Sequence, residues 1–141
     1  MMKFLKLKSI EITFMIILII SLFNCSQPKE ITSPSGLIYE IVKEGSGSAA
    51  KEGDEVLINE TMSYPDGTLL FSTDQIGHPV KFLIGGNQVI DGVDEGVRGM
   101  KTGEIRKLIV PPALSKRKEY PPNLSPDSTL YYEIELVEIL K

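Results

Sequence analysis

Four stretches of the chain alternate apolar and polar residues with a period of two, which predicts half-buried β-strands. They lie around residues 37–42, 56–62, 80–84 and 130–137. A fifth, short strand is expected at 69–71, directly after the turn sequence Pro65-Asp66-Gly67. The stretch 45–48, Gly-Ser-Gly-Ser, is expected to end the strand around 37–42.

One segment has helical spacing. Ile90, Val93, Val97 and Met100 recur at intervals of three and four, which places them on one face of a helix. Acidic residues on its other side near the start suit the helix dipole. One short helix among about five strands predicts an α+β domain, with an antiparallel sheet wrapped around that helix.

The N-terminus has a different pattern. Three lysines in residues 1–11 are followed by an uncharged apolar run over 12–23, which is typical of a secretory signal peptide. Twelve residues rise only about 18 Å as a helix, too little to cross a membrane core of about 30 Å. The run ends in Leu22-Phe23-Asn24-Cys25, which resembles a bacterial lipobox, whose cysteine is lipidated; a chance free cysteine is the alternative.

These features divide the chain into three parts. We expect a signal peptide over 1–24, a lipidated Cys25 followed by a flexible tether over 25–35, and a folded domain over 36–141. The lipid chains would then supply membrane attachment. The resulting location would be the periplasmic face of a bacterial membrane, or the outer membrane.

Composition narrows the possible chemistry. The 141 residues carry a net charge of −4, so binding of nucleic acid through phosphate neutralisation is not expected. A single cysteine and a single histidine, His78, argue against an internal disulfide or a metal centre of His and Cys ligands. No pair of carboxylates has a spacing that indicates acid–base catalysis, and we expect no metal and no cofactor.

Rotation about an X–Pro amide is one reaction that needs no such group. Its barrier is about 18–20 kcal/mol, and the twisted amide of the transition state has less charge separation than the planar form. A dry apolar pocket that fits the twisted form accelerates rotation by differential binding.

The run from Gly85 to Glu104, GGNQVIDGVDEGVRGMKTGE, resembles the core motif of FKBP-type peptidyl-prolyl cis-trans isomerases. Further matches to that family occur at residues 66–73, 79–82, 106–114 and 125–136, so that the resemblance covers about 36–141. It implies an FKBP-like fold, isomerase (rotamase) activity and substrates that are proline-containing polypeptides. We expect the protein to be a monomer.

The resemblance also implies a substrate pocket with no acid, base or nucleophile. The residues that it assigns to the pocket are Leu70, Val80, Val89, Ile90, Val93 and Tyr132. Those assigned to the pocket rim are Glu60, Phe71 and Phe82.

Several positions depart from the family pattern. Glu60 stands where the family has a tyrosine, and Leu70 and Phe71 replace a phenylalanine and an aspartate. These assignments assume no gap between Val56 and Pro79, and a slip of one residue would place Phe71 at the aromatic position. The expected Tyr-Gly after Leu114-Ser115 is missing. A charged Glu60 would be shielded by Arg106 or face solvent, and it would favour substrates with a basic residue near proline.

The leading hypothesis is therefore a lipid-anchored isomerase that assists the folding of exported proteins. A catalytically weak chaperone or interaction module with the same fold is the main alternative. A surface lipoprotein without proline chemistry is a third.

Overall fold

The computed structural model describes residues 29–140. In chain order the elements are β1 (Glu30–Thr32), β2 (Ile38–Lys43), β3 (Ser46–Ala49), β4 (Glu55–Ser63), β5 (Leu69–Ser72), α2 (Thr73–Ile76), β6 (Val80–Leu83), α3 (Asp91–Val97), β7 (Lys101–Thr102), β8 (Ile105–Val110), the 3-10 helix η1 (Pro112–Leu114) and β9 (Leu130–Leu140).

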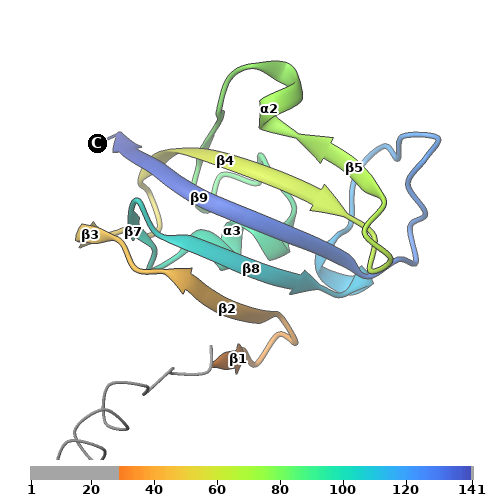
Figure 1. Cartoon of the computed structure of the whole chain (residues 1–141), viewed down its shortest axis with the longest axis horizontal. Coiled ribbons are helices and arrows are strands. Elements are labelled where there is room, and N and C mark those ends of the chain that lie inside the picture. The colour runs from red at the N-terminus through yellow and green to blue at the C-terminus, as the bar shows by residue number, and fades with distance from the viewer. Residues whose placement is uncertain (1–28, 141) are drawn as a thin grey trace, which may run out of the picture.

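The described residues form one seven-stranded antiparallel sheet in the order β1-β2-β8-β9-β4-β5, with β6 also paired to β4. A separate two-stranded sheet joins β3 to β7. In Figure 1 helix α3 lies behind the long strands β8 and β9, and the segment that leads into β9 lies at one end of the sheet. The predicted α+β class, an antiparallel sheet around a short helix, is confirmed.

Alternation along the strands creates the core. Partners across an antiparallel pair share a face of the sheet, so the pairing of Met62 with Tyr132 and of Tyr132 with Leu108 defines the inner face. The apolar residues on this face are buried, and the predicted helix residues Ile90, Val93, Val97 and Met100 are buried against them. Helix and sheet therefore enclose a single core.

Two glycines let helix α3 approach strand β8. A Cβ at Gly92 would lie 2.5 Å from Cγ1 of Val110, and a Cβ at Gly96 would lie 2.5 Å from Cδ1 of Leu108. Both distances are too short for real atoms, so larger residues would push the helix away. Their spacing of four places both glycines on the face of the helix that meets the sheet.

A buried ion pair joins this helix to β8. Arg106 donates from Nε to Oε1 of Glu104 at 2.6 Å and from Nη1 to the carbonyl oxygens of Gly96 and Arg98, both at 3.1 Å. Oε2 of Glu104 accepts from the backbone N–H of Lys101 at 3.0 Å. With Glu104 only 2% and Arg106 only 6% exposed, this pair links the end of α3 to the sheet.

One local prediction is corrected, and one strand was missed. Residues 30–32, expected to be part of a flexible tether, form the edge strand β1, which pairs with β2 from Glu30↔Glu40 to Thr32↔Ile38. The expected break after the strand at 37–42 is present, because β2 ends at Lys43, but residues 46–49 form a further, exposed strand, β3, whose partner is β7. Backbone pairing holds both strands, and neither buries the apolar side chains that make a strand visible in sequence.

The short helix α2 was also missed. Ser72 caps its start, because the Ser72 hydroxyl accepts from the N–H of Asp74 at 3.2 Å, and Gly77 ends it with a φ of 77°. Four residues are too few for a hydrophobic period, so only the capping residues could have indicated it.

Candidate functional site

The six residues that the sequence assigned to a pocket all belong to the inner side of the sheet or to the start of α3. Ile90, Val93 and Tyr132 are buried in the core. Leu70, Val80 and Val89 are partly buried and pack against it. The fold thus brings β5, β6, β9 and the segment before α3 to one apolar region.

Strand β5 contains an irregularity at this region. Phe71 pairs with Met62, and Leu69 pairs with Ser63, so that Leu70 lies in the bulge between them. Phe71 shares the inner face with Met62 because cross-strand partners lie on the same side. The aromatic ring of Phe71 therefore packs against the core.

Phe82 is not a rim residue. It pairs with Val56 and is only 2% exposed, so it belongs to the packed core. Its neighbours Lys81 and Leu83 are exposed, as alternation along β6 requires.

Glu60 occupies the inner side of β4 between buried Ile58 and buried Met62. Its backbone is held by Thr73, whose Oγ1 accepts from the Glu60 N–H at 3.0 Å and donates to the Glu60 carbonyl oxygen at 3.3 Å. Its Oε2 is buried and has no hydrogen-bond partner among the residues that the structure describes. Burial raises the pKa of this carboxyl to about 7, and the charge of Arg117 opposes the rise.

Arg117, not Arg106, is therefore the cation that acts on Glu60. Arg106 is committed to Glu104, whereas Arg117 lies in the segment between η1 and β9 and turns toward the sheet. Its Nη2 donates to the hydroxyl of Tyr132 at 2.8 Å and lies 3.2 Å from the sulfur of Met62. Its Nε is buried without an acceptor in the described part of the chain.

Tyr132 completes this cluster. The residue is 4% exposed, and its hydroxyl lies 2.9 Å from the sulfur of Met62. Burial raises the pKa of Tyr132 to about 12, Arg117 lowers it and Glu60 raises it. The phenol is therefore neutral at physiological pH, and it offers a hydrogen bond rather than a charge.

We call Glu60, Met62, Arg117 and Tyr132 the polar cluster. Sequence reasoning named two of its members and missed Arg117, because the basic run at 116–118 is usual for a solvated loop. The missing Tyr-Gly after Ser115 was the available signal, since it marked a changed segment beside the predicted pocket.

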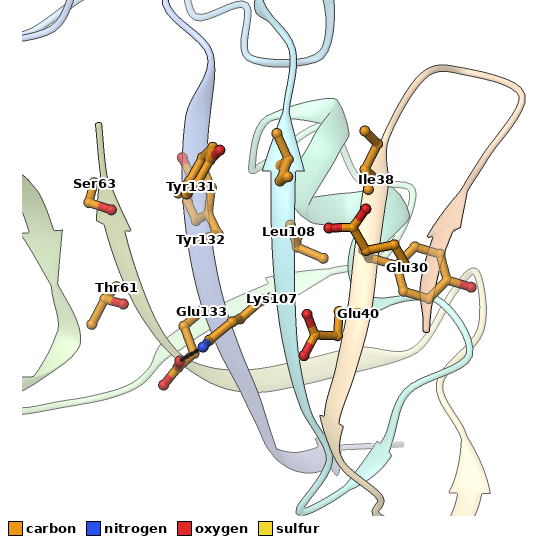
Figure 2. Close-up of a pocket in the computed structure, with 12 residues that line it drawn as sticks. Glu30, Ile38, Glu40, Thr61, Ser63, Lys107, Leu108, Tyr131, Tyr132 and Glu133 are labelled. Atoms are coloured by element: carbon orange, nitrogen blue, oxygen red, sulfur yellow. Dashed lines mark ion pairs between the residues drawn. The ribbon is translucent and has the colours of Figure 1, made fainter. Parts of the chain in front are cut away.

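The outer face of the sheet holds a separate cleft of about 460 Å³ (Figure 2). A cross-strand row, Glu30, Glu40, Lys107, Glu133 and Thr61, runs along it. Within this row Lys107 and Glu133 form an exposed ion pair at 3.9 Å. None of the six predicted pocket residues except Tyr132 lines this cleft, so it is distinct from the apolar region on the inner face.

Residues 29–140 contain few side chains that could act as acid–base catalysts or metal ligands. This part of the chain contains no group of three or more His, Cys, Asp or Glu residues arranged to hold a metal. His78 is exposed, and its Nδ1 lies 3.1 Å from the carbonyl oxygen of Pro79. The inner-face region offers apolar surface, one phenol and two groups with unpartnered atoms.

The predicted lipidation site, Cys25, and the signal peptide lie outside the described residues. Within 29–140 no helix has the length and hydropathy needed to cross a membrane.

The class of protein is indicated by an antiparallel sheet that folds around one short helix and has an apolar region on its inner face. Residues 46–137 match the model of the family described as FKBP-type peptidyl-prolyl cis-trans isomerase. The chain belongs to this family.

Individual relatives support the same family assignment. The chain is 36% identical over 108 residues to the FKBP-type peptidyl-prolyl cis-trans isomerase FkpA of Escherichia coli (strain K12), an alignment that covers 77% of this chain and 39% of FkpA. It is 39% identical over 105 residues to FK506-binding protein 2 of Yarrowia lipolytica, covering 74% of this chain and 73% of that protein. The match therefore spans about two fifths of FkpA, which has sequence beyond it.

Solved structures give the same result. The crystal structure of FkpA from Escherichia coli has a TM-score of 0.71 at 34% identity, covering 81% of this chain and 53% of that one. The crystal structure of AtFKBP13 has a TM-score of 0.71 at 27% identity, covering 79% and 99%.

Proposed function

We propose that this protein is a peptidyl-prolyl cis-trans isomerase that assists the folding of exported, proline-containing polypeptides. The observation that carries the proposal is the family match over 46–137, together with the apolar residues on the inner face at the matching positions. The substrate site would be the region formed by Leu70, Val80, Val89, Ile90, Val93 and Tyr132, with Phe71 beside it.

The physical basis is the polarity of the amide. The planar X–Pro amide has more charge separation than the twisted form, so an apolar surround favours the transition state over the ground state. This acceleration moves no proton, which agrees with the neutral Tyr132 phenol and with a site that has no nucleophile.

The test is exchange NMR on a peptide with an apolar residue before proline, with catalytic amounts of the full chain in mild detergent. We expect exchange above the uncatalysed rate. Leu70→Asp should abolish it, because a charge would be placed beside the twisted amide. The matched control is Leu69→Asp, since Leu69 is the exposed neighbour on β5 and its substitution should leave the rate unchanged. Equal rates for both variants would contradict the proposed site.

Lipid anchoring through Cys25 belongs to the same proposal. It is supported by the apolar run over 12–23 and by the position of the only cysteine directly after it. Cys25→Ala should release the protein from the membrane fraction or leave it as unprocessed precursor. A variant that remains processed and membrane-bound would contradict the anchor, and Ser26→Ala is the matched control that should remain attached.

A chaperone or interaction module with weak catalysis is the second candidate. The polar cluster favours it, because Glu60 and Arg117 introduce charged groups beside the region where the twisted amide needs an apolar surround. Capture of an unfolded, proline-containing polypeptide with no exchange above the uncatalysed rate would support this candidate over the first.

A further inference from the structure

The segment that follows η1 carries three consecutive cations, Lys116, Arg117 and Lys118, in a chain whose net charge is −4. Lys116 and Lys118 are exposed, whereas Arg117 is partly buried and turns inward to Tyr132. Its backbone is also fixed, because the Arg117 N–H donates to the hydroxyl of Tyr120 at 3.2 Å. One cation is thus held within the site region, and two lie beside it at the surface.

Arg117 has no directly paired counter-charge among the described residues, although it interacts through space with Glu60. None of the ion pairs formed among residues 29–140 includes it. Its Nη2 contacts only the neutral Tyr132 hydroxyl and Met62 sulfur, and its buried Nε has no acceptor. A guanidinium in this state gains more from a carboxylate than from a neutral group, because charge-assisted hydrogen bonds are shorter and roughly twice as strong.

From this geometry, and resting on the proposed function, we propose that Arg117 is a specificity residue. It binds the carboxylate of an acidic residue that flanks the proline of the substrate, while Lys116 and Lys118 attract acidic polypeptides to the site.

Glu60 alone would suggest a preference for substrates with a basic residue near proline, and this inference reverses that preference. A substrate lysine near Glu60 would also lie near Arg117, which carries a permanent charge, whereas much of the Glu60 carboxyl is protonated at neutral pH because burial raises its pKa to about 7. The cation is therefore the dominant charge of the cluster. Glu60 opposes acidic substrates in part, so its removal should strengthen the preference.

The experiment is exchange NMR with the full chain in mild detergent on four peptides that differ only beside proline, with Glu, Gln, Lys or Leu. One series places this residue before the proline and a second places it after. Glu and Gln are nearly isosteric, so the ratio of their kcat/KM values isolates the charge. We expect a preference for Glu of about tenfold in at least one series, as one charge-assisted hydrogen bond would produce.

Three variants test the assignment to Arg117. Arg117→Gln should bring the Glu-to-Gln ratio close to one, and Arg117→Lys should restore part of the ratio. Glu60→Gln should raise it. Lys43→Gln, an exposed residue at the end of β2 with the same loss of charge, is the matched control and should leave the ratio unchanged.

Two results would overturn the inference: a Glu-to-Gln ratio near one in both series, or a ratio that Arg117→Gln and Lys43→Gln lower equally. If no peptide shows exchange above the uncatalysed rate, the proposed catalysis is wrong. The inference is then decided by the dissociation constants of the same peptides, measured by chemical-shift titration. Tighter binding of the Glu peptide that depends on Arg117 supports it, and equal binding overturns it.

Discussion

Two combinations of glutamate and arginine lie on the inner side of the same sheet, and they differ in how completely they are paired. Glu104 and Arg106 contact each other at 2.6 Å, and Arg106 also donates to two backbone carbonyls while Glu104 accepts from a backbone N–H. Glu60 and Arg117 each retain a buried polar atom without a partner.

The difference separates a structural role from a binding role. Buried charges are tolerated when their hydrogen bonds are complete, and an incomplete set costs free energy that a ligand can recover. The Glu104–Arg106 pair links the end of α3 to β8 and has little left to offer a ligand. The polar cluster includes Tyr132 of the proposed substrate site, and two of its buried atoms have no partner among the described residues.

Breaking the complete pair should give the largest effect on stability. Glu104→Gln leaves the Arg106 guanidinium buried without its counter-charge, and we expect a loss of about 3–5 kcal/mol in the free energy of unfolding. Urea denaturation measures this. Glu133→Gln, which removes the exposed partner of Lys107, is the control and should cost less than about 1 kcal/mol. Equal losses would mean that the buried pair has no special role.

Removing the charge of Glu60 should stabilise the fold, and the size of this effect should depend on pH. Its pKa is raised from 4.5 to about 7, so between these values the folded protein holds a proton that the unfolded chain has released. Stability therefore falls as the pH rises from 4.5 to 7, and the full penalty remains above that range. Glu60→Gln should stabilise the fold by up to about 3 kcal/mol at pH 8.

The measurement is urea denaturation of wild type and variant at pH 4 and pH 8. Wild type and variant should have nearly equal free energies of unfolding at pH 4, where the Glu60 carboxyl is mostly protonated in both the folded and the unfolded protein. Glu138→Gln, on an exposed position of β9, should produce no comparable difference between the two pH values. A stabilisation of Glu60→Gln that is the same at both pH values would contradict the electrostatic explanation.

Replacing Arg117 should have the smallest effect on stability. Arg117→Met removes a cation whose side-chain hydrogen-bond partners are neutral, so the free energy of unfolding should change by less than about 1 kcal/mol. The same variant should raise the pKa of Glu60 above about 7, because the Arg117 charge now opposes the effect of burial. Titration of the Glu60 carboxyl by carbon-13 NMR measures this. An unchanged pKa would show that the two charges do not interact.

Local patterns predicted much of the fold. The four alternating stretches became strands, and the four residues with helical spacing are buried: Val93 and Val97 lie in α3, Ile90 caps its start, and Met100 follows its end. The edge strands β1 and β3 were missed because backbone pairing, rather than side-chain burial, holds them. The family motifs indicated the six proposed pocket residues, whose role in substrate binding stays a prediction, as does the lipid anchor at Cys25.

The sequence by itself determined the periods of two and 3.6, the order of the motifs and the family, because these depend on neighbours a few residues apart. Only the tertiary structure decided which charges meet. Arg117 reaches Met62 from 55 positions away, and Arg106, one of the two expected ways to accommodate a charged Glu60, pairs with Glu104 instead. The physical reason is that a charge interacts through space with whatever the fold brings near, and burial then determines how strong that interaction becomes.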